Sequence, residues 1–340
     1  MTKINLLSHK ISFFSTQPYD QTFFEKYNAD FGFELEFFDI QLNEQTVTLV
    51  DNKAIVCVFV NDVVNAAVIK KLAEKEVKII ALRCAGFNNV DLEAAKKHGI
   101  QVCRVPAYSP EAVAEHAMAM ILTLNRKTHK AYNRVREQNF SLHGLLGFDL
   151  HGKTIGIIGT GNIGKAFSKI AKGFGSTVVA YDVVKDSGME ADGVQYVALD
   201  TLIKKSDIIS LHCPLNDETR HLINKKTLAQ MKTNVMIINT SRGALINTSD
   251  VIKGLKSGKV GYLGIDVYEQ EEKLFFRDLS EDIIQDDKIQ RLMSFPNVLV
   301  TAHQAFFTNE ALTQIALITL SNVKELALNG QTKDQLTQLV

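Results

Sequence analysis

The sequence has 340 residues, of which 46% are hydrophobic and 22% are charged, and its formal net charge is zero. This length suits two domains, and the composition is ordinary for a globular protein. A zero net charge without a basic block argues against nucleic acid or an anionic membrane as the main partner. The N-terminus lacks a signal-peptide pattern, and no apolar run approaches the ~20 residues that span a bilayer. We therefore expect a cytoplasmic protein.

The cysteines and histidines give no sign of a metal site. The four cysteines are far apart and none forms a CxxC pair, which predicts free thiols. The histidines form no cluster with the spacing of zinc ligands. We expect no bound metal.

The first third of the chain alternates strand and helix signals. Short runs rich in β-branched and aromatic residues predict strands at 11–14, 34–38, 54–59, 78–82 and 100–103. Runs with helical spacing of apolar residues predict helices at 19–27, 64–74 and 92–97. This alternation is typical of an α/β fold, in which helices cover a parallel sheet.

A long helix is predicted to begin at Ser109, which suits an N-cap and is followed by proline and an acidic residue. The helix is expected to run to about Arg136. Its first half, 112–124, is almost wholly apolar and should be buried, and we interpret His116 there as packed core. Its second half, 126–136, is basic, which we interpret as a solvated helix face.

The central stretch reads as strand, glycine turn, helix, strand and acid. An apolar run at 153–158 leads into a GxGxxG turn at 159–164 and a helix at 165–174. A second strand at 177–181 ends at Asp182. Glycine turns alone are common, but here every neighbouring element lies where a dinucleotide-binding motif requires it.

Each part of this motif has a physical task. Gly159 permits a tight turn, Gly161 lets a pyrophosphate approach the backbone, and Gly164 lets the helix pack closely on the strand. The helix N-terminus offers N–H groups and the positive end of its dipole to phosphate. Asp182 suits a free ribose 2′-hydroxyl, and the two valines after it offer no charge for a 2′-phosphate, so NAD is favoured over NADP.

Four further strands, at 207–211, 235–239, 262–266 and 298–301, are predicted after Asp182. Helices are expected at 251–256 and 309–328. Ligands bind beyond the carboxyl ends of parallel strands, so the residues after each strand are the candidates for chemistry. These are His212-Cys213-Pro214, Thr240-Ser241-Arg242-Gly243, Asp266 with Glu271, and His303.

These residue types suit hydride transfer to a ketone. His303 is expected to protonate the carbonyl oxygen, with a carboxylate holding the imidazole. Arg242 is expected to bind a substrate carboxylate. From the residues alone Glu269, Glu271 or Glu272 can be the partner of the histidine, and each candidate also has a purely structural interpretation.

Five segments in this order resemble the D-2-hydroxyacid dehydrogenase family, and within it the bacterial fermentative D-lactate dehydrogenases. They are 83–91, 105–116, 239–243, 266–271 and 303–306, and the likeness covers nearly the whole chain. The resemblance implies two Rossmann-like domains with the active site in the cleft between them. Residues 1–108 and 305–340 would form a flavodoxin-like substrate domain, and residues 109–304 an inserted NAD-binding Rossmann domain.

The resemblance also implies roles for single residues. Glu271 becomes the partner of His303. Ala85 and Gly86 should bind the substrate carboxylate with Arg242, and Tyr108 should face the substrate. The residues that should lie against NAD are Gly159, Gly161, Asn162, Ile163, Gly164, Asp182, Cys213, Pro214, Thr240, Ser241 and Asp266.

The function that this resemblance implies is reversible reduction of pyruvate to D-lactate by NADH, in a homodimer or higher homo-oligomer. Two alternatives stay open: a related enzyme for a bulkier 2-keto acid, and a non-catalytic NADH-sensing protein. The segment 274–287 looks like that of the lactate subgroup, but we interpret it as a solvated loop pinned by Phe275 and Phe276.

Overall fold

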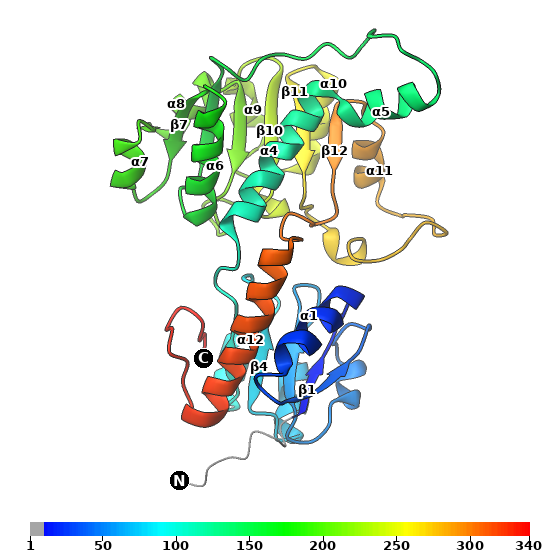
Figure 1. The fold of residues 1–340 in the computed structure, drawn as a ribbon, viewed down its shortest axis with the longest axis vertical. Helices are drawn as coiled ribbons and strands as arrows, with labels where there is room; N and C mark the ends of the chain where they lie inside the picture. Colours follow the sequence, from blue (N-terminus) through cyan, green and yellow to red (C-terminus); the bar gives the residue numbers. More distant parts are fainter. Residues whose placement is uncertain (1–9) are drawn as a thin grey trace. The chain divides into compact units, whose positions relative to one another are not determined.

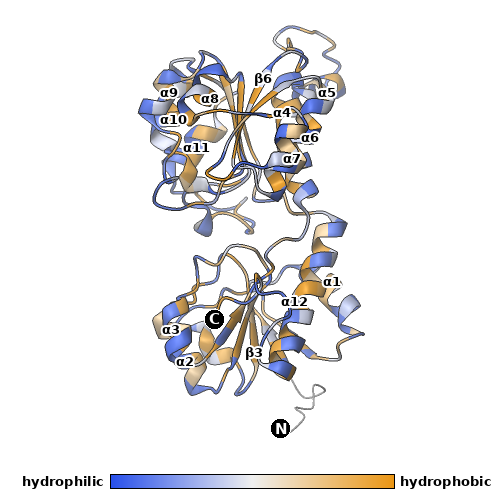
Figure 2. Cartoon of the chain, turned by 90° about the vertical axis from the view of Figure 1, so that its left-hand side faces the viewer, coloured by the Kyte–Doolittle hydropathy of each residue, from blue (hydrophilic) through white to orange (hydrophobic). Residues whose placement is uncertain are grey.

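The computed structural model describes residues 10–340, so residues 1–9 of the predicted substrate domain lie outside the described part. The chain forms two compact units, Met1–Ser109 with Phe307–Val340, and Pro110–Phe306. Each unit contains one parallel sheet with helices on both faces (Figure 2). The predicted α/β class with two Rossmann-like halves is confirmed.

The first unit has a five-stranded sheet in the order β2-β1-β3-β4-β5, the flavodoxin-like order. Two of its inner strands, β3 and β4, are apolar at every position because helices cover both faces. The strands are β1 (Lys10–Phe13), β2 (Glu34–Phe37), β3 (Ile55–Val58), β4 (Ile79–Leu82) and β5 (Gln101–Cys103). The helices are α1 (Pro18–Asn28), α2 (Ala66–Glu74), α3 (Leu92–Lys97) and α12 (Asn309–Asn329), with a 3-10 turn at Thr46–Leu49.

The C-terminal helix α12 belongs to this first unit although it follows the whole second unit in sequence (Figure 1). It lies beside α1, where Tyr27 and Thr313 share a hydrogen bond of 3.1 Å. It ends at Gly330, whose φ of 71° suits glycine at a helix C-terminus. Segments from both ends of the described chain therefore form the first unit.

The second unit has a seven-stranded sheet in the order β12-β11-β10-β9-β6-β7-β8, with neighbouring strands parallel. The strand order reverses between β6 and β9, which is where ligands bind in open α/β sheets. The strands are β6 (Thr154–Ile158), β7 (Thr177–Tyr181), β8 (Gln195–Tyr196), β9 (Ile208–Leu211), β10 (Val235–Asn239), β11 (Val260–Ile265) and β12 (Val298–Val300).

Two apolar cores lie on opposite faces of this sheet. Helices α4, α6 and α7 cover one face, and α8 to α11 cover the other (Figure 2). Their bounds are α4 (Pro110–Arg126), α5 (Thr128–Arg136), α6 (Asn162–Gly173), α7 (Ser187–Ala191), α8 (Leu199–Lys205), α9 (Lys225–Gln230), α10 (Thr248–Lys256) and α11 (Asp287–Met293). Short 3-10 turns occur at Gly243–Leu245 and Glu271–Lys273.

The predicted single helix from Pro110 to about Arg136 is wrong, because it breaks at Lys127. This residue has a left-handed backbone with φ of 51°, and its amine donates to the carbonyls of Gly144 and Leu146. The buried Asn125 side chain also exchanges two hydrogen bonds with the backbone of Phe148. Contacts with the 144–148 loop thus end α4. The basic half is solvated as predicted, since α5 has no buried residue.

Among the described residues, no helix combines the length and the apolar character needed to cross a bilayer.

Candidate active site

The glycine turn lies at the end of β6, beside the point where the strand order reverses. Gly159 has a φ of 96°, and a Cβ there would lie 2.4 Å from the backbone nitrogen of Cys213. A Cβ on Gly164 would lie 2.1 Å from the carbonyl oxygen of Gly159. A Cβ on Gly161 would meet nothing within 4 Å, so this position faces open space. Gly159 therefore forms the tight turn and Gly164 the close packing that were predicted, while the approach of a pyrophosphate at Gly161 stays a prediction.

The N-terminus of α6 and Asp182 frame that open space. Helix α6 begins at Asn162, and its first N–H groups, including that of Ile163, precede the intrahelical ladder. The Asp182 carboxylate accepts hydrogen bonds from Thr160 N at 2.6 Å and Thr160 Oγ1 at 3.0 Å. Burial alone would raise the pKa of this carboxyl, but the hydrogen bonds from Thr160 and Val184 outweigh it and lower the pKa. Asp182 therefore stays an anionic acceptor near neutral pH.

The loop after β9 closes the other side of the turn. Cys213 is buried, which raises the pKa of its thiol to about 11 and leaves it a neutral packing residue. Its carbonyl accepts a hydrogen bond of 2.7 Å from Ser241 Oγ. The buried Oγ1 of Thr240 has no hydrogen-bond partner among residues 10–340. A polar ligand would satisfy this oxygen, so the residues at this edge fit NAD.

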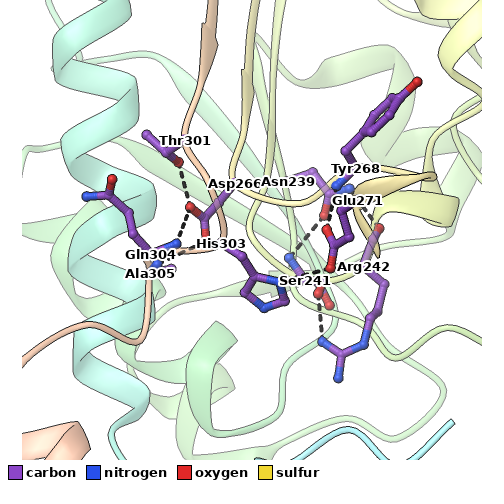
Figure 3. A network of polar contacts seen from close by, with 10 residues as sticks. All are labelled: Asn239, Ser241, Arg242, Asp266, Tyr268, Glu271, Thr301, His303, Gln304 and Ala305. Carbon is purple, nitrogen blue, oxygen red and sulfur yellow. Dashed lines mark hydrogen bonds and ion pairs between the residues drawn. The ribbon is translucent and has the colours of Figure 1, made fainter. Parts of the chain in front are cut away.

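The loop after β10 carries Arg242. The side chain of Asn239, at the end of the strand, is fully buried. Its amide donates to the Arg242 carbonyl at 2.8 Å and its oxygen accepts from Ser241 N at 3.1 Å. The Arg242 guanidinium donates to the Ser241 carbonyl at 2.7 Å (Figure 3). Gly243 has no room for a Cβ, which would lie 2.1 Å from the carbonyl carbon of Tyr268. The strand end thus holds the arginine in one local conformation.

His303 and Glu271 form a close pair (Figure 3). The Nδ1 of His303 lies 2.9 Å from Glu271 Oε1, and both side chains are about one-fifth exposed, at 19% and 22%. The second oxygen of Glu271 accepts a hydrogen bond of 2.8 Å from Tyr268 N. The pairing leaves the imidazole Nε2 for another partner. The predicted choice of Glu271 is confirmed as a contact, because Glu269 pairs with His221 instead.

The backbone of His303 is held by Asp266 (Figure 3). His303 has a left-handed φ of 53°, and its N–H donates to the Asp266 carbonyl at 2.8 Å. The Asp266 carboxylate accepts from Gln304 N at 2.8 Å, Ala305 N at 3.0 Å and Thr301 Oγ1 at 2.5 Å. This side chain is fully buried, so its observed task is to fix the loop that carries His303. Direct contact of Asp266 with the nicotinamide stays a prediction.

His116 is part of this network, which corrects its interpretation as packed core. Its Nε2 lies 3.2 Å from Thr301 Oγ1 and 3.5 Å from Asp266 Oδ1. Burial would raise the pKa of Asp266, but hydrogen bonds from His116 and Thr301 and the charge of His303 outweigh burial and lower it. The signal that marks His116 in the sequence is a histidine that follows Glu115 in an otherwise mostly apolar stretch of helix.

The loop after β4, in the first unit, carries the predicted substrate residues. The Ala85 carbonyl accepts from Arg104 at 3.0 Å, and the Gly86 carbonyl accepts from the Cys84 thiol at 3.3 Å. Within residues 10–340, the N–H groups of Ala85 and Gly86 donate to no protein acceptor. Free N–H groups suit a carboxylate. The substrate contacts of this loop and of Tyr108 stay predictions.

A buried ion pair that the sequence analysis missed lies behind this loop. Arg83 is fully buried and contacts Asp20 at 3.2 Å, while its guanidinium also donates to the Ser15 carbonyl at 2.8 Å. The pair ties α1 to the end of β4. Within the described residues, no group of three His, Cys, Asp or Glu side chains is placed to hold a metal ion.

Comparison with known proteins agrees with this geometry. Residues 118–305 match the family described as D-isomer specific 2-hydroxyacid dehydrogenase, NAD binding domain. The chain is 56% identical to a 2-hydroxyacid dehydrogenase homolog of Haemophilus influenzae, over 93% of this chain and 96% of that protein. It is 54% identical to the D-lactate dehydrogenase of Escherichia coli, over 95% of this chain and 98% of the relative.

A solved structure of a relative is also similar to this chain. The apo structure of D-lactate dehydrogenase from Escherichia coli superposes with a TM-score of 0.89 at 50% identity, covering 97% of this chain and 100% of the other. The superposition covers nearly the whole of both units. The chain therefore belongs to the D-isomer specific 2-hydroxyacid dehydrogenase family.

Proposed function

We propose that this protein is an NAD-dependent D-lactate dehydrogenase that reversibly reduces pyruvate. The observation that carries the proposal is the His303–Glu271 pair, which lies on the same sheet edge as Arg242 and the glycine turn. A proton donor, a carboxylate-binding cation and a dinucleotide site are the three groups that this reaction needs.

The side chains divide the reaction among them. Arg242 binds the pyruvate carboxylate through its planar guanidinium. When bound, the reduced nicotinamide supplies the hydride that the keto carbon accepts. His303 donates the proton from Nε2 to the carbonyl oxygen, and Glu271 stabilises the protonated imidazole through Nδ1. In the reverse direction the neutral imidazole accepts the proton of the hydroxyl.

The deciding experiment measures NADH oxidation with pyruvate, followed by chiral analysis of the lactate formed. We expect turnover with pyruvate and a D product. An L product, or no turnover with any 2-keto acid, would overturn the proposal.

Two other candidates are tested in the same assay. A panel with phenylpyruvate and a branched-chain 2-keto acid identifies an enzyme for bulkier substrates by their higher kcat/KM. Tight NADH binding without oxidation across the whole panel identifies a sensor. The intact set of Arg242, Glu271 and His303 favours catalysis over sensing.

For the assembly we propose a homodimer. Helix α5 and the segment after it expose several large apolar side chains: Tyr132 (62%), Val135 (50%), Phe140 (73%), Leu142 (82%) and Leu146 (86%). Figure 1 shows this segment extending away from the sheet of its own unit. An apolar strip of this kind is typical of a protein interface. Sedimentation at several concentrations tests the proposal, and a monomer throughout would overturn it.

The compartment we propose is the cytoplasm. All four cysteines are free and buried, as in proteins of a reducing compartment. Fractionation of the producing cells, with lactate dehydrogenase activity as the marker, tests this assignment.

A further inference from the structure

Two phenylalanines, Phe275 and Phe276, lie in the long segment between β11 and α11, and they have different environments. Phe275 is 7% exposed and belongs to the apolar core on one face of the seven-stranded sheet. Phe276 is half-buried at the edge of the same core. The segment beyond them is mostly exposed, and Ile283 is 85% exposed. The prediction of a solvated loop pinned by two phenylalanines is therefore confirmed, but it leaves the second ring without a stated task.

Phe276 contacts the imidazole of His303. The two ring centroids lie 5.8 Å apart at an angle of 37°. Phe276 reaches this position with a left-handed backbone, at φ of 62°. A bulky residue in this region is strained, and such strain persists only where surrounding contacts impose it. The backbone is thus bent in the way that lays this ring beside the histidine.

The His303 imidazole is consequently enclosed by three side chains. Glu271 holds Nδ1, Phe276 packs on the ring, and the Phe306 ring lies 6.5 Å away with its plane at 77°. A single hydrogen bond at Nδ1 leaves the ring free to pivot about that bond. A ring turned about its Cβ–Cγ bond would no longer offer Nε2 in the same direction.

His221 shows the other arrangement. Its Nε2, not its Nδ1, lies 2.7 Å from Glu269. Within residues 10–340, His221 makes no close contact with an aromatic ring. A glutamate can therefore hold either ring nitrogen, so pairing with a glutamate does not by itself decide which nitrogen of a histidine is left for a substrate.

We propose that Phe276 is a positioning residue for proton transfer, because it keeps Nδ1 of His303 on Glu271 and Nε2 directed to the substrate oxygen. This inference rests on the proposed function. Phe276 acts through His303 and takes no part in the bond changes. It is not among the residues expected to lie against NAD, so we expect its replacement to change the rate of the chemical step and not the affinity for NADH.

The test compares Phe276→Leu, which removes the ring, with Phe276→Tyr, which keeps it. We expect kcat to fall about tenfold in the leucine variant, because a small misplacement of a catalytic group slows the chemical step. We expect a larger solvent deuterium isotope effect on kcat, an unchanged NADH dissociation constant, and recovery in the tyrosine variant. Ile283→Ala, in the same segment, is the control and should match the wild type.

Two further readouts keep the test decisive. Loss of the Phe276 ring should shift the His303 ring protons in the NMR spectrum, which needs no substrate. Phe276→Met is made in parallel, so that a folding defect of the leucine variant does not end the experiment. An unchanged kcat and isotope effect in the ringless variants, or equal losses of kcat and NADH affinity, would overturn the inference. The wild-type rate with pyruvate tests the proposed function separately, since the inference concerns only the ratio of variant to wild type on the best 2-keto acid.

Discussion

Two histidine–glutamate pairs lie near the carboxyl edge of the seven-stranded sheet, and they look alike. His303 pairs with Glu271 at 2.9 Å, and His221 pairs with Glu269 at 2.7 Å. Both histidines have a left-handed backbone, with φ of 53° and 52°. In both pairs the second glutamate oxygen accepts a backbone N–H, from Tyr268 in one and from Thr248 in the other.

The difference lies in which ring nitrogen the glutamate holds. Glu271 holds Nδ1, so Nε2 of His303 is left to act on a substrate. Glu269 holds Nε2 of His221, and the His221 N–H donates to the Ala244 carbonyl, two residues after Arg242. The second pair therefore braces the arginine loop. Proximity of a histidine and a carboxylate does not by itself identify a catalytic pair, because the free nitrogen decides the task.

Replacing each histidine by glutamine tests whether the two pairs have different tasks. We expect His303→Gln to lower kcat by roughly 10²–10⁴-fold, the usual contribution of a general acid. NADH binding, measured by fluorescence titration, should not change. His221→Gln is the matched control and should keep kcat within about twofold, since it makes no contact with a reacting atom. Similar losses of kcat in both variants would remove the distinction between the pairs.

A smaller effect on turnover is expected from the two glutamates. Glu271→Gln should lower kcat by about 10- to 100-fold, because an amide neither stabilises the imidazolium as well nor fixes its tautomer. Glu269→Gln should change KM for pyruvate more than kcat, since its pair supports the Arg242 loop. Steady-state kinetics with both variants separates these outcomes, and a kcat loss at Glu269 equal to that at Glu271 contradicts the assignment.

Stability should rank the pairs differently from activity. The Glu269 carboxylate pairs with the His221 imidazole and accepts a hydrogen bond from Thr248 N, in the first turn of α10, so it links the loop that carries His221 to this helix. Its replacement by glutamine should lower the free energy of unfolding by about 1 kcal/mol, as expected for disturbed hydrogen bonds of a half-buried group. Urea unfolding of Glu269→Gln against the exposed control Glu272→Gln measures this. Equal stabilities would show that the brace is dispensable.

The smallest expected effect is the pH dependence of that stability. Burial alone would raise the pKa of Glu269, but hydrogen bonds from Thr248 and His221 hold its pKa below the ordinary value. A carboxyl with a lowered folded-state pKa stabilises the protein above its unfolded-state pKa, and this contribution is lost as the pH falls through the folded-state pKa. The difference in unfolding free energy between wild type and Glu269→Gln should therefore shrink from pH 7 towards acid. A difference in unfolding free energy that grows on acidification would contradict a lowered folded-state pKa of Glu269.

The parts of the site that the sequence predicts are those whose residues lie close together in the chain. The glycine turn, the strand before it and the acid after the next strand are neighbours in sequence, so their spacing alone predicts a nucleotide site. The strand ends with Arg242 and His303 were found because parallel strands deliver their carboxyl ends to one edge. Short elements such as β8 and α7 carry too few residues for a periodic signal and were not predicted.

The contacts that select one residue among several are not local. Glu269, Glu271 and Glu272 lie within four positions, and periodicity does not tell which of them reaches a histidine more than thirty residues away. His116 contacts Asp266 and Thr301 from α4, a helix that lies far from both residues in the sequence. The break at Lys127 likewise depends on carbonyls of the 144–148 loop. Each of these outcomes is set by packing between distant segments.

The sequence by itself determined the fold class, the NAD motif and the edge of the second sheet that carries Arg242 and His303, because backbone geometry converts short periodic patterns into strands, helices and turns. Only the tertiary structure decided which glutamate serves His303, which ring nitrogen it holds, and that Phe276 lies against the imidazole. Those choices depend on distances of a few ångströms between segments far apart in the chain, and such distances exist only once the sheet has brought them together.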